Sequence, residues 1–423
     1  MLKSFFATWI IYWLVVLLLP VHSIYPGVYP AFMLQLCFVL LVAVGYCSVP
    51  LLCRSSGSPS VQQGRIPNAN LLIRVSIFLS LIGFCSLLFD KVYIQHVSYL
   101  DGLAVAREQW RQLGEEREGK VSSIWSAIGY LVGSSYYAGL VLTITQSAFL
   151  TAGQRIRAMA LVFFFVLTNS IITGGRSNFL LLAVVAIAAL SSRRSIKLAS
   201  VFQSPTQRRL FHFGAAISVC YIVYIFYARA DAGNQLVSTY VSGFLPYLGL
   251  EFDGWYRSNL ENDSIGASFN MLVLVLSYMT HSFATVAAIV DAPLEDKTIL
   301  FHNAASLLYK LDLTNKPDDL WFLSGRFPSV PGALWHQYGV FGFFLGSLFL
   351  GGASGAAKVW AAIIPNRVLP LAAHVLTCAT LLLTPYVFAP DVLSFPYVAF
   401  AFVMLAALSR ALMHVVRRLQ VTR

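Results

Sequence analysis

One apolar block of the chain ends in YIVYIFYARAD (residues 221–231), and the next opens with SGRFPSVPGALWHQYG (residues 324–339). Between Arg229 and Arg326 lie roughly a hundred residues of mixed polarity, which hold 11 of the 18 acidic residues. In a chain that is 58% hydrophobic, polar residues at this density need water or a charged ligand. The stretch therefore predicts an external region that forms the working site of a membrane protein.

The composition points to the same class. Only 11% of the 423 residues are charged and the mean hydropathy is +0.71, whereas soluble domains have about 25% charged residues. We expect an all-α, polytopic membrane protein with a single integral membrane domain over residues 1–423. The six cysteines form no CxxC pair, which favours buried inert thiols. The net charge of +11 comes from bases in short loops, a topology signal, so no nucleic acid is expected.

Ten apolar segments are long enough to be read as membrane spans, since a span needs about 17 to 25 residues. The first lacks a small-residue cleavage pattern and is interpreted as a retained anchor. The predicted spans cover residues 5–20, 30–53, 71–89, 124–150, 158–173, 178–191, 210–228, 334–352, 368–388 and 395–413.

The loops between these spans alternate in charge. Seventeen bases fall in one set of loops and in the termini without any acidic residue, and all 18 acids fall in the other set. This is the positive-inside pattern, and it predicts that both termini are cytoplasmic. A single crossing at residues 271–290 would place the basic C-terminal tail outside. That segment is therefore expected to be re-entrant or interfacial, or to cross and return through residues 298–311.

Two external regions are predicted. The smaller one, residues 90–123, carries GLAVAREQWRQLGEEREG, in which Glu108, Arg111, Glu115 and Glu118 recur at helical spacing. A solvated surface helix is the simplest reading, and a lid over the site is the alternative. The larger one, residues 229–331, is expected to form the active site.

A short turn between two predicted spans carries Gly174, Gly175 and Arg176. The helix after it is about 14 residues, or roughly 21 Å, so the turn is expected to sit recessed in the membrane. Glycines let backbone amides approach a phosphate closely, and an arginine there is stabilised by an anion. The alternative is an arginine that reaches the lipid headgroups.

Three other external arginines complete a cationic set: Arg229, Arg257 and Arg326. Guanidinium groups suit bidentate recognition of phosphate, although each also fits a plain interfacial anchor. Arg257 follows Trp255, whose ring could stack on a sugar as well as on lipid. Asp231 is either a partner of Arg229 or a catalytic base.

Five residues are candidates for a general base: Asp231, Glu251, Asp253, His281 and His336. Glu251 and Asp253 imitate a metal-binding acid-x-acid pair, but one such pair is a weak signal, so no metal and no cofactor are expected. No P-loop, HExxH or GxSxG motif is present.

These features resemble the oligosaccharide repeat-unit polymerases of the Wzy type, which extend O-antigen and related surface glycans. The likeness rests on the turn at Gly175 to Ser177, the large external region, its apolar helix around Tyr278, and YGVFGFFLGSLFLG at residues 338–351. It spans most of the chain. His336 departs from the acidic or aromatic residue expected before the glycine of this last stretch.

The resemblance implies a fold of the GT-C-like class and a metal-independent glycosyltransferase of lipopolysaccharide biosynthesis in the bacterial inner membrane. It implies that a glycan on undecaprenyl pyrophosphate is transferred to a lipid-linked repeat unit on the periplasmic face. Membrane lipids and a chain-length regulator are the further partners. The expected catalytic residues are Arg176, Arg229, Arg326, His281, His336 and Asp231, and the expected substrate-binding residues are Arg257, Tyr278, Trp255, Glu251 and Asp253. An O-antigen ligase and a flippase or transporter remain the alternatives.

Overall fold

The computed structural model describes most of the chain. The described residues are 1–52, 64–117, 120–173, 175, 177–192, 205–233, 235–257, 264–290, 292, 299–310, 313–315, 326–392 and 394–421. Arg176, Gly174 and Glu118, which the sequence singled out, lie outside them.

The described chain is helical apart from two short strands. Its elements are α1 (Leu2–Leu18), β1 (Val21–Ser23), α2 (Val28–Leu52), α3 (Ala69–Phe89), the π-helix η2 (Asp90–Ile94), α4 (Leu103–Glu116), α5 (Ile124–Gly133), α6 (Ser135–Thr145), η3 (Ser147–Phe149), α7 (Ala152–Thr173), α8 (Ser177–Ser191), α9 (Pro205–Ala232), α10 (Val237–Tyr247), β2 (Leu250–Phe252), α11 (Gly254–Arg257), α12 (Ser264–Thr280), α13 (Ser282–Val290), α14 (His302–Lys310), α15 (Val330–Ile363), α16 (Val368–Leu383), η5 (Ala389–Asp391) and α17 (Phe395–Val421).

The prediction of an all-helical, polytopic membrane protein is confirmed at this level. Among the described residues, seven helical segments are long and apolar enough to cross a bilayer, and they match seven of the ten predicted spans. The other three predicted spans coincide with the shorter apolar helices α1, α8 and α16. A bent pair, α12 and α13, is a further broken or re-entrant segment.

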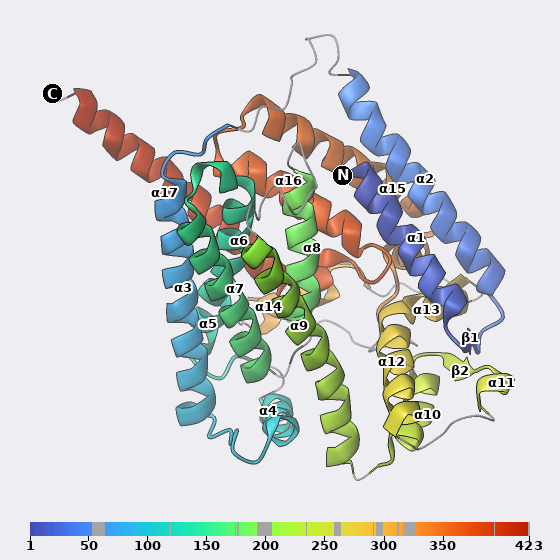
Figure 1. Ribbon diagram of the computed structural model, residues 1–423. Coiled ribbons are helices and arrows are strands. Elements are labelled where there is room, and N and C mark those ends of the chain that lie inside the picture. The colour runs from blue at the N-terminus through green and yellow to red at the C-terminus, as the bar shows by residue number, and fades with distance from the viewer. Residues whose placement is uncertain are drawn as a thin grey trace.

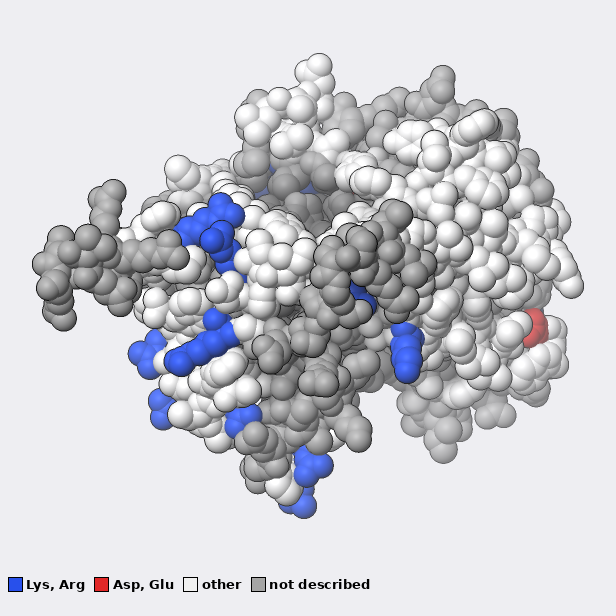
Figure 2. Space-filling view, turned by 90° about the horizontal axis from the view of Figure 1, so that it is seen from above, with Lys and Arg blue, Asp and Glu red and all other residues white. Residues whose placement is uncertain are grey.

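The acidic residues are distributed unevenly between the two ends of the helical bundle. Both chain ends lie on one side of it, and α4 and α10 lie on the other (Figure 1). We call the first side the basic face, since Figure 2 shows Lys and Arg side chains gathered on it, with an acidic side chain visible only at its margin. The opposite side, called the acidic face, carries Asp101 just before α4, Glu108 on α4, Asp231 near the end of α9 and Glu251 on β2. The charge separation predicted from the loops is thus present in the fold.

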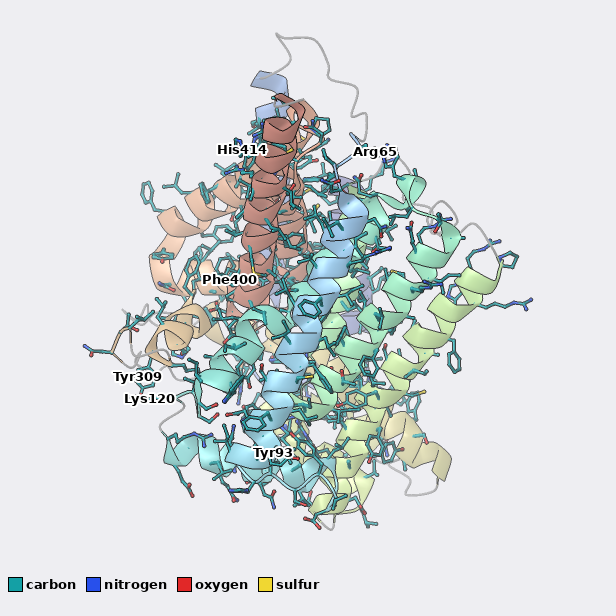
Figure 3. All side chains as sticks on the ribbon, turned by 90° about the vertical axis from the view of Figure 1, so that its left-hand side faces the viewer. Arg65, Tyr93, Lys120, Tyr309, Phe400 and His414 are labelled. Carbon is teal, nitrogen blue, oxygen red and sulfur yellow. The ribbon has the colours of Figure 1, made fainter. Side chains whose placement is uncertain are left out.

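The region between α9 and α15 contains a bent pair of helices. The helices α12 and α13 meet at a bend of 47°, and α14 is the next described helix along the chain. Backbone N–H of Val121 donates to Lys310 (3.4 Å), and the ammonium of Lys120 lies 5.9 Å from the ring centre of Tyr309. Figure 3 shows Lys120 and Tyr309 together, toward Tyr93 and away from Arg65 and His414. Within the described residues, α14 has nine residues and is about 14 Å long, and the pair α12 and α13 fits either a broken span or a re-entrant loop.

The two strands connect the N-terminal part of the chain to the large polar region. They pair antiparallel, with Val21 opposite Phe252 and Ser23 opposite Leu250. Nδ1 of His22 lies 2.9 Å from a carboxylate oxygen of Asp253 beside this pair. The link between α1 and α2 is thereby fixed to the segment that follows α10.

Glycines allow α2 and α15 to pack backbone to backbone. Between membrane helices, close packing replaces the hydrophobic effect as the force of association, so small residues lie at interfaces. Gly351 and Gly355 of α15 face the backbone of Val42 and Tyr46, and Gly45 of α2 faces Leu348. Nearer the start of α15, Gly339 has φ 63°, which kinks the helix. The kink separates a short buried N-terminal part from the long part that packs on α2.

The packing of α2 on α15 leads to a stability prediction, for which the neighbouring glycine serves as the control. An added Cβ at Gly351 would overlap the carbonyl oxygen of Val42, whereas one at Gly352 would have its nearest neighbour, the carbonyl oxygen of Gly45, at 3.8 Å. We expect Gly351→Ala to destabilise the protein by about 1–3 kcal/mol and Gly352→Ala to leave it unchanged. Thermal unfolding of the purified variants in one detergent measures this. Equal Tm values for the two variants would contradict the packing described.

Candidate functional site

A cavity of about 720 Å³ lies among α7, α8, α9, α12 and the link between α16 and α17. Its volume is in the range of small-molecule sites, about 300–1,000 Å³. Most of its lining is apolar, and α8 and α9 contribute the largest share. The apolar residues from these two helices are Phe179, Leu180, Leu182, Ala183, Ala186, Ala215, Val219, Ile222 and Phe226.

A few polar groups from distant parts of the chain also line the cavity. Its titratable lining residues are Arg107 on α4, Tyr278 and His281 at the end of α12, and Tyr386 and Asp391 after α16. The backbone at the start of α8 contributes Gly175 and Ser177. The first N–H groups of a helix have no partner within it and carry a partial positive charge, so this end of the cavity favours an anion.

Both ring nitrogens of His281 are held by backbone groups. Nδ1 lies 2.6 Å from the carbonyl oxygen of Tyr278, so Nδ1 carries the proton and donates. Nε2 accepts from the N–H of Phe327 at 3.3 Å. The neutral ring therefore ties the bend between α12 and α13 to the loop before α15. For His281 to act as a base, the bond from Phe327 would first have to break.

Arg326 lies beside the cavity. Its Nη1 donates to the hydroxyl of Tyr25 at 2.7 Å, and its guanidinium carbon lies 5.7 Å from the ring centre of Tyr247. Gly249, with φ 78°, permits this approach, since an added Cβ there would lie 3.3 Å from Nη1. Arg326 is not among the lining residues, but the next residue, Phe327, is.

The other predicted site residues that the structure describes lie outside the cavity. Arg229 is half-buried and Asp231 is exposed near the end of α9. Trp255 (67% exposed) and Arg257 are exposed on α11.

Two further candidate bases lie on the acidic face, and a third lies in the interior. Glu251 is exposed on β2, and Asp253 pairs with His22. His336 is buried in the N-terminal part of α15 and does not line the cavity. Of the described arginines in the predicted cationic set, Arg229, Arg257 and Arg326, none lines the cavity. Their convergence on one cavity is not seen, and for Arg176 it stays a prediction.

The sequence reasoning missed both charged lining residues, Arg107 and Asp391. Asp391 did carry a signal, because it is the one acidic residue between the last two predicted spans. A charged side chain next to apolar segments is costly and is therefore a functional candidate. Arg107 gave no signal of its own among the many charges of its helix.

Helix α4 lies at the acidic face and brings Arg107 to the cavity. It is fastened to the end of α3 by buried charges. The ammonium of Lys91, which is 1% exposed, lies 4.2 Å from the ring centre of Trp110. The adjacent Asp90 accepts hydrogen bonds from Ser122 and Ser123 at the start of α5. The lid interpretation of this helix stays a prediction.

The side chains on the outer surface of α4 form exposed ion pairs. Arg111 donates to Glu108 at 2.7 Å and to Glu115 at 2.9 Å, as the helical spacing predicts. The hydrogen bond from Arg111 lowers the pKa of Glu108. In the link before α4, burial and then the charge of Asp90 raise the pKa of Tyr99 to about 12, and its hydroxyl donates to the carbonyl of Ile172 at 2.9 Å.

Replacing Trp110 is expected to release α4. A desolvated cation–π contact contributes about 2 kcal/mol, so Trp110→Ala should reduce amide protection in α4 roughly 30-fold. The matched control is Arg111→Ala on the same helix, which removes only exposed ion pairs and should leave protection unchanged. Hydrogen exchange in detergent micelles measures both. Protection that is unaltered in Trp110→Ala would show that this contact does not hold the helix.

Comparisons with protein-family models, with curated proteins and with solved structures gave no match to this chain. The chemistry of the cavity is therefore inferred from its own residues.

Proposed function

We propose that this protein is a glycosyltransferase that polymerises lipid-linked oligosaccharide repeat units into a surface polysaccharide such as O-antigen. The proposal builds on the resemblance to the Wzy-type polymerases in the turn at Gly175 to Ser177 and in the layout of the spans.

The observation that carries the proposal is the mixed lining of the cavity. The lining combines a large apolar part from α8 and α9 with the polar residues Arg107, Ser177 and Asp391. A molecule that fits both parts has an apolar chain and an anionic head. Undecaprenyl pyrophosphate, which carries the glycan in this class of reaction, has that chemistry.

The reaction needs stabilisation of a leaving group. The hydroxyl oxygen of the acceptor sugar attacks the anomeric carbon of the donor sugar, the bond from that carbon to the phosphate oxygen breaks, and pyrophosphate leaves with the electron pair. Preorganised donors and positive charges stabilise the charge that develops. In this chain, Arg107 and the N-terminal amides of α8 supply them at the cavity, and Arg176 stands in sequence between the lining residues Gly175 and Ser177.

We place the reaction on the periplasmic side of the bacterial inner membrane. The basic face would then be cytoplasmic, in keeping with the positive-inside rule. The polar part of the cavity includes Arg107 of α4, a helix of the acidic face. Lipid-linked donor and acceptor would therefore meet the site after they have been moved to the outer leaflet.

Analysis of the surface glycan in a deletion strain tests the proposal. Loss of a polymerase leaves single repeat units on the cell surface, and complementation restores long chains. Polymer that is made but stays on its lipid carrier would instead indicate a ligase. Repeat units that never reach the periplasm would indicate a flippase.

A further inference from the structure

The link between α16 and α17 is an irregular stretch of backbone in the interior of the molecule. Residues 387–389, 391 and 392 are buried, and Asp391 is 8% exposed. Asp391 is the acidic residue that lines the cavity within the described ranges. Irregular backbone at such depth is tolerated where it is buried in protein or lines a cavity, and a buried acid there needs a reason.

A strained segment fixes the orientation of this carboxylate. Oδ2 of Asp391 accepts from the N–H of Phe301 at 3.1 Å. Phe301 has φ 64°, a conformation that is strained for a non-glycine residue and that collects at functional sites. Its ring stacks edge-on against Phe388 at 4.8 Å, which helps to keep it in place.

The segment before Phe301 is tied down as well. The N–H groups of Ile299 and Leu300 both donate to Oε1 of Gln337 on α15, at 3.0 and 2.9 Å. Three successive amides thus bind two side chains from different elements. The bond from Phe301 therefore fixes the orientation of one carboxylate oxygen of Asp391 at the wall of the cavity.

We propose that Asp391 is the general base of the reaction; this inference rests on the proposed function. As the acceptor hydroxyl oxygen bonds to the anomeric carbon, its proton passes to the carboxylate of Asp391, and the bonding pair of the broken C–O bond leaves with pyrophosphate. The acid so formed then returns its proton to water. Positioned proton transfer contributes about 10²–10⁴-fold to a rate.

The candidates suggested by the sequence are placed less well for this step. Asp231 and Glu251 are exposed and outside the cavity, and His336 is buried but does not line it. Asp253 pairs with His22, and the Nε2 lone pair of His281 accepts from a backbone amide. The other titratable lining residues, Arg107, Tyr278 and Tyr386, are unsuited to accept a proton at neutral pH.

The test compares Asp391→Asn with Gln337→Ala in purified protein that extends lipid-linked repeat units. Asparagine retains an oxygen for the N–H of Phe301, so the fold and KM should be close to wild type while turnover falls about 10²–10⁴-fold. Gln337→Ala removes the acceptor for two amides without touching the base, so its Tm should fall and its turnover should stay within about tenfold of wild type. Wild-type turnover in Asp391→Asn would overturn the proposal, as would a purely structural result in which both variants lose only stability.

A second variant covers the case in which Asp391→Asn does not fold. Asp391→Glu retains the carboxylate but displaces it, and a displacement of about 1 Å costs up to about 10²-fold in rate. Turnover equal to wild type in that variant would reject Asp391 as the base. If wild-type protein itself extends no chains, the proposed function fails; if it does and Asp391→Asn matches it, only this inference fails.

Discussion

Cells whose only copy of the protein carries Arg176→Ala are expected to display single repeat units in place of long surface chains. The neighbours of Arg176 on both sides, Gly175 and Ser177, line the cavity at the start of α8. Loss of one preorganised donor to a developing anion lowers turnover by about 10²–10³-fold. Arg176→Lys should retain part of the activity, because an ammonium supplies the charge but not the bidentate geometry.

The matched control is Arg257→Ala. Arg257 belongs to the same predicted cationic set but is exposed on α11 and does not line the cavity. Its removal should leave the chain-length distribution unchanged. Both variants need normal amounts of protein in the membrane fraction. Long chains at normal abundance in Arg176→Ala would count against a phosphate site at this turn.

Filling the apolar part of the cavity is expected to block the reaction without touching a charged group. Ala215 on α9 lines the cavity, and the adjacent Ala216 does not. A tryptophan at position 215 would occupy space proposed for the lipid chain, and overpacking of about 1–3 kcal/mol corresponds to a loss of roughly 10–10²-fold in binding. We expect Ala215→Trp to raise KM for the lipid-linked unit, as measured by chain extension in detergent.

The same substitution one residue along separates blockage from damage to the helix. Ala216→Trp places an equal bulk on an exposed part of α9, so it should bind substrate as wild type does. If both variants lose activity equally, the effect lies in membrane insertion. If neither does, the apolar wall of α8 and α9 is not where the lipid chain binds.

The spans were predictable because their signal is local. Apolar length and the distribution of bases identified ten segments, and each contains a helix. The differences arise from contacts between helices. The single predicted span at residues 124–150 is broken at Ser134 into α5 and α6, where Gly133 packs against Gly83 of α3.

The cavity was not predictable because its residues are far apart in the chain. Arg107 and Asp391 are separated by more than half of the sequence, and neither belongs to a motif. Topology placed Arg229, Arg257 and Arg326 on one face, but it could not tell a lining residue from one at the rim. Arg326 illustrates this, since its partner Tyr25 comes from the other end of the chain.

For the amphipathic helix α4, the outer surface was predictable from the sequence and the inner surface was not. Its i to i+3 and i to i+4 charge pattern predicted α4 and the contacts of Arg111 with Glu108 and Glu115. Its inner surface was not visible in the pattern. The contact of Trp110 with Lys91, and the placement of Arg107 at the cavity, depend on how the end of α3 meets this helix.

The most direct test is chain extension by the purified protein in lipid nanodiscs supplied with undecaprenyl-pyrophosphate-linked repeat units alone. A polymerase should convert them into a ladder of longer lipid-linked chains with release of undecaprenyl pyrophosphate, and the ladder should be absent with Arg176→Ala. Single units that remain unextended by correctly folded wild-type protein would contradict the proposed function.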